Sequence, residues 1–196
     1  MTDEQGNEII RLWEGPAPLL DAQRALRTVR ARADEWAVEP ARLGIWGFSA
    51  GGHLAATAAT QPHAGDLAAP DPVDRLSCHP DFAILSYPVI SLTAPYTHVG
   101  SRLNLLGERA SETLVEQLSA EKQVTADTPP TFLFHTDADT GVPAENSVAF
   151  YLALREAGVP AELHIYETGG HGLGLAQSDP VLGTWAERLE DWLASR

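Results

Sequence analysis

The sequence predicts an α/β fold in which a mostly parallel sheet is flanked by helices. Apolar runs of strand length alternate along the chain with segments whose apolar residues recur at helical spacing. Turns rich in glycine and proline separate these segments. Strands that alternate with helices pair in parallel through right-handed crossovers, so their carboxyl ends share one rim of the sheet. Ligands bind at that rim in sheets of this kind.

The length and composition are those of one ordinary globular unit. The chain has 196 residues, of which 44% are hydrophobic and 20% are charged. This length is sufficient for one hydrophobic core and short for two domains. We therefore predict a single domain over residues 19–196. An N-terminal segment, residues 1–18, precedes it and is expected to be partly mobile.

Charge and cysteine content exclude several classes of partner. The formal net charge of −14 argues against nucleic acid or an anionic membrane surface as a partner, and no apolar run approaches the ~20 residues of a membrane span. Cys78 is the only cysteine, so we expect neither an internal disulfide nor a cysteine-based metal site. No cluster of His, Asp or Glu has the spacing of metal ligands, and no glycine-rich loop offers a phosphate cradle, so we expect no metal and no other cofactor. The first residues are acidic and polar, unlike a signal peptide. The chain as written is expected to be cytoplasmic, or secreted if a signal peptide precedes it.

In the first half of the chain, strands and helices alternate from the start. Residues 8–13 are compatible with a short strand. Between residues 19 and 36, apolar side chains recur at helical spacing and arginines fill the opposite face. Residues 43–48 form an apolar run that predicts a buried strand, and the alanine-rich residues after Ser49 predict a helix packed on it.

The second half of the chain repeats the alternation. Strands are expected over residues 81–87, 131–135 and 161–167, the last nearer the sheet edge because its apolar and polar residues alternate. Helices are expected from Ser111 to about residue 121, over residues 144–157, and from Asp179-Pro180 onward. Residues 61–80 are expected to form a polar loop, and residues 89–110 to be irregular because of their breakers Pro95, Gly100 and Gly107.

The sequence Gly47-x-Ser49-x-Gly51 lies where the strand 43–48 gives way to the helix. A serine on a sharp strand-to-helix turn has a strained backbone, and side chains two residues to either side would collide, so glycine is expected at both places. Such a turn also points the backbone N–H of Ala50 and the helix N-terminus at a developing oxyanion. We predict Ser49 as a nucleophile. The alternative is a glycine-rich turn that only packs the helix against the sheet.

Two further polar groups follow predicted strands on the same rim. His171, between Gly170 and Gly172, lies on a turn flexible enough to reach Ser49, and we predict it as the general base. Asp139 lies deeper in its loop than Asp137, so we predict Asp139 as the acid that orients His171. The remaining histidines are weaker candidates, and two of them are expected to be structural: His53 through packing and His135 as an anchor of the acid loop.

Several motifs together resemble α/β-hydrolase esterases of the carbohydrate acetylesterase type, often called acetylxylan esterases and related to bifunctional acetylxylan and feruloyl esterases. The resemblance runs from about residue 19 to the C-terminus, and it rests on these stretches: Gly47-Phe48-Ser49-Ala50-Gly51-Gly52-His53-Leu54-Ala55, Tyr87-Pro88-Val89-Ile90, Thr97-His98-Val99-Gly100-Ser101-Arg102-Leu103-Asn104-Leu105-Leu106-Gly107, Pro129-Pro130-Thr131-Phe132-Leu133-Phe134-His135-Thr136, Val142-Pro143-Ala144-Glu145-Asn146-Ser147 and Gly169-Gly170-His171-Gly172. It implies Ser49 as nucleophile, Asp139 as acid and His171 as base, the order nucleophile, acid, histidine being that of α/β-hydrolases.

The resemblance also implies a difference at the front of the chain. Relatives begin with several more strands and carry an H-G-G-G-like loop that supplies a second oxyanion donor, and this sequence has neither. We therefore expect a hydrolase core that lacks the first strands, with the strand 43–48 at an open edge. Only the Ala50 N–H is assigned to the oxyanion hole, and its second donor is unknown. Covering the open edge by self-association would make the protein a homo-oligomer.

The sequence thus predicts a serine esterase that hydrolyses short-chain carboxylic esters through an acyl-enzyme. A small ester or an acetylated carbohydrate is the expected substrate, from the resemblance. The alternative from another class is a catalytically weak or inactive truncated homologue that acts as a binding or scaffold protein. A small peptidase or a dienelactone-type hydrolase on the same scaffold is a third possibility. Neither the sugar, the preferred acyl length nor the oligomer size follows from the sequence.

Overall fold

A computed structural model describes residues 18–196, and the strand expected over residues 8–13 lies outside them. Its first elements are α1 (Pro18–Ala31), α2 (Ala33–Trp36), β1 (Gly44–Phe48), α3 (Ala50–Thr60), the 3₁₀ turn η1 (Pro72–Arg75), β2 (Phe82–Ser86) and α4 (Val99–Leu106). They are followed by α5 (Glu112–Gln117), the 3₁₀ turn η2 (Ala120–Gln123), β3 (Thr131–Thr136), α6 (Glu145–Glu156), β4 (Ala161–Tyr166) and α7 (Thr184–Ala194). None of the helices in this range combines the length and apolar character needed to cross a membrane.

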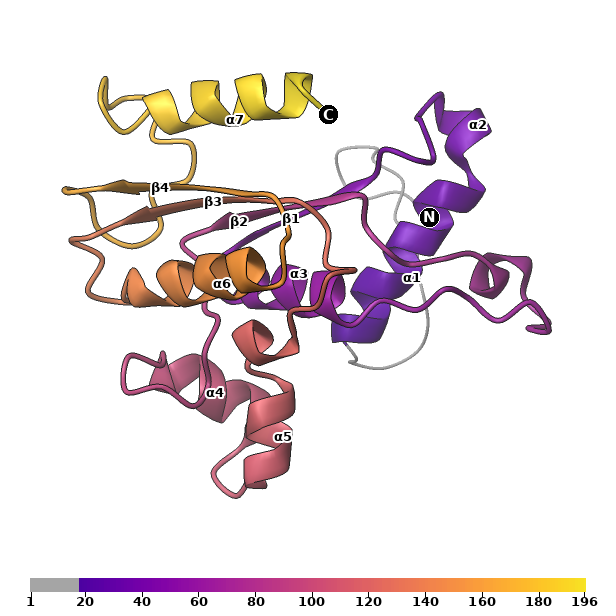
Figure 1. The fold of residues 1–196 in the computed structure, drawn as a ribbon, viewed down its shortest axis with the longest axis horizontal. Helices are drawn as coiled ribbons and strands as arrows, with labels where there is room; N and C mark the ends of the chain where they lie inside the picture. The colour runs from indigo at the N-terminus through magenta and orange to yellow at the C-terminus, as the bar shows by residue number, and fades with distance from the viewer. Residues whose placement is uncertain (1–17) are drawn as a thin grey trace, which may run out of the picture.

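The predicted α/β fold is confirmed. Four strands form one sheet in the order β1-β2-β3-β4, and each neighbouring pair is parallel. The strand order equals the chain order, so every connection between strands crosses over in the same sense and the four carboxyl ends share one rim. Figure 1 shows the sheet as a layer between α7 on one side and α3 and α6 on the other.

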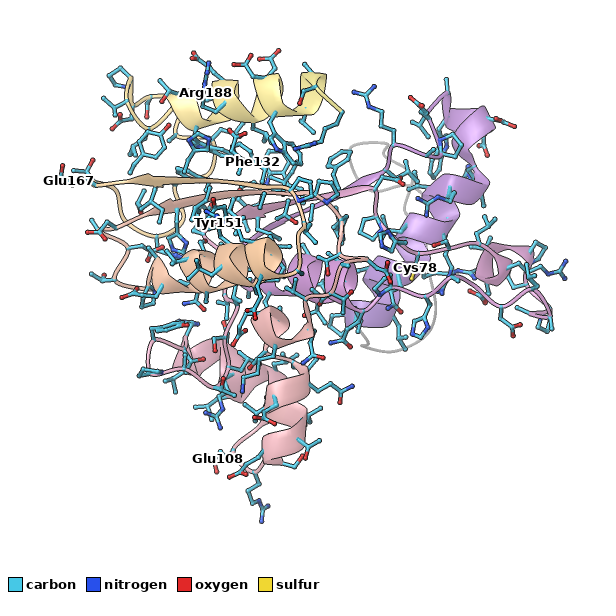
Figure 2. All side chains as sticks on the ribbon, in the orientation of Figure 1. Cys78, Glu108, Phe132, Tyr151, Glu167 and Arg188 are labelled. Carbon is cyan, nitrogen blue, oxygen red and sulfur yellow. The ribbon has the colours of Figure 1, made fainter. Side chains whose placement is uncertain are left out.

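The core lies on both faces of the sheet because successive side chains of a strand point to opposite sides. On the face towards α3 and α6, Leu85 and Leu133 pack against Phe150. On the face towards α7, Phe132 and Phe134 pack against the tryptophans of that helix. Figure 2 shows Phe132 between the sheet and α7, and Tyr151 on the opposite side, on α6. Burial on both faces explains why β2 and β3 are continuous apolar runs rather than alternating ones.

The helix expected over residues 19–36 is divided in two. The structure ends α1 at Ala31 and begins α2 at Ala33, with Arg32 between them outside helical geometry (ψ 16°). The left-handed Ala37 (φ 52°) then ends α2. Leu26, Val29, Ala33 and Trp36 keep helical spacing through this break, so the pattern alone does not reveal it.

The expectation that residues 89–110 are irregular is wrong, because α4 lies within them. The side chain of His98 accepts a hydrogen bond from the Ser101 amide and so caps the N-terminus of α4. Gly100 sits in the first turn, and Gly107 (φ 73°) closes the C-terminal end. The expectation that both glycines break the chain is therefore wrong, since Gly100 lies inside the helix and Gly107 is its cap.

The last helix starts later than the sequence suggests. Asp179 Oδ1 accepts hydrogen bonds from the amides of Val181 and Leu182, each at 2.9 Å, and forms a turn. The helix α7 begins only at Thr184. An aspartate followed by proline is typical of a helix N-terminus and of such a turn, and the two have the same local signature.

Candidate active site

Ser49 occupies the sharp turn between β1 and α3. Its backbone is in a rare conformation for a residue with a side chain, with φ 54° and ψ −122°. Its amide donates to the Ser86 carbonyl at 3.0 Å, and its carbonyl accepts from Val89 at 3.1 Å and from His53 at 3.2 Å. The turn is therefore held by hydrogen bonds from β2, from the segment after it, and from α3. Strain of this kind persists only where the surroundings over-determine it.

The glycines around Ser49 differ in why they are needed. A Cβ at Gly47 would lie 2.0 Å from the carbonyl oxygen of Gly51, which no side chain can tolerate. A Cβ at Gly51 would meet nothing within 4 Å, so the expectation that this glycine avoids a collision is wrong for the described residues. The second crowded position is Gly52, where a Cβ would lie 2.7 Å from Pro88 Cβ. Close packing of α3 against β1 therefore requires glycine at position 47, and close packing of α3 against Pro88, which follows β2, requires glycine at position 52.

Ala50 is the first residue of α3. A backbone N–H at this position has no partner inside the helix, and the helix dipole makes the N-terminus of this 11-residue helix electropositive. A negative oxygen next to Ser49 Oγ would be stabilised there. This is the geometry that the sequence analysis assigned to an oxyanion donor.

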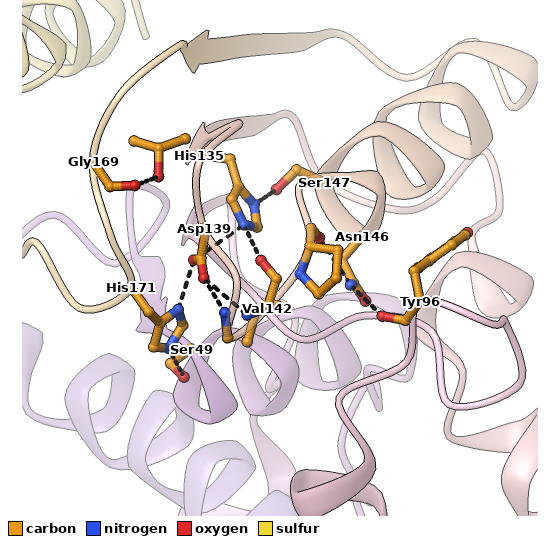
Figure 3. A network of polar contacts seen from close by, with 12 residues as sticks. Ser49, Tyr96, His135, Asp139, Val142, Asn146, Ser147, Gly169 and His171 are labelled. Atoms are coloured by element: carbon orange, nitrogen blue, oxygen red, sulfur yellow. Dashed lines mark hydrogen bonds and ion pairs between the residues drawn. The ribbon is translucent and has the colours of Figure 1, made fainter.

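Ser49, His171 and Asp139 form one continuous hydrogen-bonded chain, drawn in Figure 3. Ser49 Oγ lies 2.7 Å from His171 Nε2, and His171 Nδ1 lies 2.7 Å from Asp139 Oδ2. A carboxylate only accepts, so Nδ1 carries the hydrogen and Nε2 is free to accept the proton of the serine hydroxyl. Residues 122 positions apart in the sequence meet here because each follows the carboxyl end of a strand.

The loop after β3 holds the Asp139 carboxylate in place. The side chain is fully buried, and its Oδ1 accepts hydrogen bonds from the amides of Gly141 and Val142, each at 2.9 Å. Asp137, the alternative acid, is exposed, and its amide donates to Tyr166 at 2.8 Å and continues the ladder between β3 and β4. The structure thus places the carboxylate of Asp139, and not that of Asp137, against His171.

Two residues for which the sequence predicts no role of their own support the loop of His171. The Tyr87 ring meets the His171 ring edge-on, with centroids 5.1 Å apart, and its hydroxyl accepts from the Gly174 amide at 3.0 Å. Thr136 Oγ1 donates to the Gly169 carbonyl at 2.9 Å. Both lie at the carboxyl end of a strand, Tyr87 directly after β2 and Thr136 as the last residue of β3, and this position is the signal that could have identified them.

His53 is buried away from this chain of contacts. Its Nε2 lies 2.7 Å from the Leu118 carbonyl. Burial lowers the pKa of His53, and the hydrogen bond to Leu118 opposes that shift. The hydrogen bond therefore ties α3 to Leu118, the residue that follows α5, as the sequence leads one to expect of a packing residue.

Two hollows adjoin the turn at Ser49. A cavity of about 570 Å³ lies between α3 and α4, and Ala50, Gly51, Leu54 and Leu105 are among its lining residues, none of which carries a charged side chain. A groove of about 620 Å³ follows β1 and is closed on its other side by α1. Within residues 18–196, β1 has a strand partner on one side only, and its Trp46 and Phe48 are 42% and 36% exposed.

Comparisons with known proteins give one consistent group of relatives. The crystal structure of an acetyl ester-xyloside bifunctional hydrolase from Caldicellulosiruptor lactoaceticus is 48% identical, superimposes with a TM-score of 0.90, and is matched over 95% of this chain and 68% of its own. Endo-1,4-beta-xylanase B of Butyrivibrio fibrisolvens is 39% identical over 170 residues, which are 86% of this chain and 26% of the xylanase. Acetylxylan esterase of Xylanibacter ruminicola is 34% identical over 189 residues, which are 91% of this chain and 35% of the esterase.

The chain thus spans about a quarter to a third of the length of these two curated relatives. The BD-FAE family model matches residues 13–154, more than half of the chain and including the turn at Ser49. The four-stranded parallel sheet with helices on both faces matches the fold of the solved hydrolase. With these agreements in sequence and fold, the chain belongs to the BD-FAE family of α/β-hydrolases.

Proposed function

We propose that this protein is a serine esterase that hydrolyses short-chain carboxylic esters, with acetyl groups on carbohydrate as the substrate class. The observation that carries the proposal is the chain of two 2.7 Å contacts from Ser49 through His171 to Asp139, built on a strained turn at a helix N-terminus. The relatives named as acetyl ester-xyloside hydrolase and acetylxylan esterase support the choice of acetyl esters and of carbohydrate.

In the first half of the proposed reaction, Ser49 Oγ attacks the ester carbonyl carbon. The hydroxyl proton passes to His171 Nε2, which lies 2.7 Å away, and Asp139 stabilises the imidazolium that forms. The carbonyl oxygen becomes negative and accepts the Ala50 N–H. The tetrahedral intermediate then collapses, the C–O bond to the alcohol breaks, and His171 returns the proton to the departing alkoxide.

In the second half, water attacks the acyl group on Ser49. His171 Nε2 takes a proton from the water, and the second tetrahedral intermediate forms. Its collapse breaks the bond between the acyl carbon and Ser49 Oγ, His171 returns the proton to Oγ, and the carboxylic acid is released. The same Ala50 N–H stabilises the oxyanion. A second oxyanion donor is unassigned, and the absence of one donor typically costs about 10²–10³ in rate. The rate of ester hydrolysis by this chain should therefore be about 10²- to 10³-fold lower if no second N–H donor reaches the oxyanion.

Labelling with a fluorophosphonate, followed by acetate release from acetylated xylo-oligosaccharides, tests the proposal. An activated Ser49 reacts covalently with the fluorophosphonate, and Ser49→Ala does not. Acetate release by the native chain and none by the variant supports the esterase, and a matched panel of peptides and lactones tests the peptidase and dienelactone-type alternatives. Labelling without turnover on any ester, or no labelling at all, favours the inactive binding or scaffold protein instead.

We further propose that the chain self-associates through the edge of β1. This strand contains neither a charged residue nor a proline, the devices that normally protect an edge, and two of its aromatic side chains are partly exposed. A second copy can continue the sheet by pairing its own β1 with this edge. Sedimentation velocity across a range of protein concentrations measures this, and a monomer at every concentration contradicts it.

A further inference from the structure

A second histidine lies directly behind the acid loop. His135 belongs to β3, and its side chain is fully buried. Its Nδ1 lies 2.7 Å from Ser147 Oγ on α6, and its Nε2 lies 2.8 Å from the Val142 carbonyl oxygen. Figure 3 shows the ring between Ser147 and the loop that carries Asp139. His135 therefore joins β3, α6 and the acid loop through one side chain.

These two partners determine where the protons of His135 are. A carbonyl oxygen only accepts, so Nε2 carries a hydrogen and donates it to Val142. Burial lowers the pKa of His135, and the hydrogen bond to Val142 and the nearby Asp139 charge oppose that shift without reversing it. The ring is thus neutral near pH 7, and Nδ1 accepts the hydrogen bond from the Ser147 hydroxyl.

His135 acts on the Asp139 carboxylate in two ways. First, the Val142 amide donates to Asp139 Oδ1 at 2.9 Å, so holding the Val142 carbonyl also holds the turn that orients the carboxylate. Second, His135 Nε2 lies 3.5 Å from Asp139 Oδ2, the same oxygen that receives His171 Nδ1–H at 2.7 Å. A neutral ring supplies the positive end of an N–H dipole there, whereas a charged ring would compete with His171 for the carboxylate.

We infer that His135 is a positioning residue for the proposed ester hydrolysis, because it holds Val142 and thereby keeps the Asp139 carboxylate aligned with His171. Its role in turnover rests on the proposed function, whereas its role in geometry does not. Misplacement of a catalytic group by about 1 Å typically costs on the order of 10²-fold in rate, so loss of this support should lower kcat. The KM should stay unchanged, since the side chain is buried behind the acid and does not face the substrate.

Substitutions at His135 can separate its two hydrogen bonds. In His135→Gln the side-chain amide nitrogen can take the place of Nε2 and donate to Val142. In His135→Leu the volume is largely kept and both hydrogen bonds are lost. His164→Leu is the matched control, since His164 is a half-buried histidine on β4 whose polar partner is Glu162, outside the acid loop.

Two readouts distinguish positioning from a purely structural role. The first is kcat on p-nitrophenyl acetate, calculated from the concentration of protein whose serine reacts with the fluorophosphonate. Unfolded protein, which does not react, is thereby left out of the value. We expect a loss of about 10- to 100-fold at unchanged KM for His135→Leu, with most of the native kcat kept by His135→Gln and His164→Leu. The second is the far-downfield proton resonance of His171 Nδ1–H, which needs no turnover and should weaken or shift only in His135→Leu.

A folded His135→Leu with native kcat per competent serine and an unchanged downfield resonance would overturn the inference. If His135→Leu does not fold, His135→Met takes its place, because it also loses both hydrogen bonds while its flexible side chain fills the buried space more easily. Unchanged kcat and resonance in that variant would also overturn it. If the native chain hydrolyses no ester, the proposed function fails, and the resonance comparison alone decides the role of His135.

Discussion

The glycines around Ser49 give a sharp prediction, because two positions of one motif should respond in opposite ways. An alanine at position 47 would place Cβ 2.0 Å from the Gly51 carbonyl oxygen, where ordinary contacts begin at 3.4 Å. The backbone of the turn would have to move by more than 1 Å to relieve this. Overpacking typically costs 1–3 kcal/mol, and here both partners belong to the backbone, so we expect Gly47→Ala to destabilise by at least about 3 kcal/mol.

At position 51 an added Cβ meets nothing within 4 Å, and the position lies in the first turn of α3. Alanine is favoured over glycine in a helix by up to about 1 kcal/mol. We therefore expect Gly51→Ala to leave the free energy of unfolding unchanged or to raise it by up to about 1 kcal/mol. The two variants should differ by roughly 3–4 kcal/mol, a large share of the ~5–15 kcal/mol total of a typical domain.

Urea denaturation followed by circular dichroism measures both variants on the same scale. With an m-value of about 2 kcal/mol/M, the difference should separate their midpoints by roughly 1.5–2 M. Equal m-values would show that the unfolded states are comparable. An equal loss of stability in Gly51→Ala and Gly47→Ala would refute the reasoning, since it would mean that the space around Gly51 is occupied in the folded protein.

Three other predictions concern the acid, the pH dependence of stability and the sheet edge. Asp139→Asn should lower kcat on p-nitrophenyl acetate by about 10³–10⁴, because an amide can donate to His171 Nδ1 and so favours the wrong tautomer, and a native-like rate would contradict it. Burial lowers the pKa of His53 and of His135, so the unfolded chain binds more protons around and below pH ~6.5. The free energy of unfolding should therefore fall on acidification through that range, and a profile that rises instead would show the sign to be wrong. Trp46→Lys puts a charge at the edge of β1 and should shift sedimentation towards the monomer, and an unchanged distribution would place self-association elsewhere.

Much of the fold could be predicted because its signals are local. The apolar runs at β2 and β3 are buried on both faces, so their composition alone indicates parallel strands. The run before Ser49 also forms a parallel strand, but the expectation that it is buried is wrong for Trp46 and Phe48, which are partly exposed. The helix α4 could not be predicted in the same way. Its cap is the His98 ring, and glycines near its two ends have different roles that only the backbone dihedral angles separate. The break at Arg32 could not be predicted because the apolar residues keep helical spacing across it.

The candidate site was predictable to the extent that its residues follow strands. Ser49, Asp139 and His171 each follow a strand in a segment rich in turn formers, and the topology brings these strand ends to one rim. Which glycine is crowded could not be predicted, because the contact of Gly52 with Pro88 joins two segments that are far apart in the sequence. The support from Tyr87 through Gly174 depends on a long-range contact of the same kind.

Hydrolysis of p-nitrophenyl acetate by the native chain and by Ser49→Ala, each followed over a range of protein concentrations, tests the proposed chemistry most directly. Loss of a triad serine costs about 10⁶-fold where the oxyanion hole is complete, and the absence of one donor takes away about 10²–10³ of that. The native chain should therefore exceed the variant by roughly 10³-fold or more, and a specific rate that falls on dilution would show that a second copy completes the site. Equal rates for the two proteins would contradict the esterase and leave the binding or scaffold protein as the better reading of this chain.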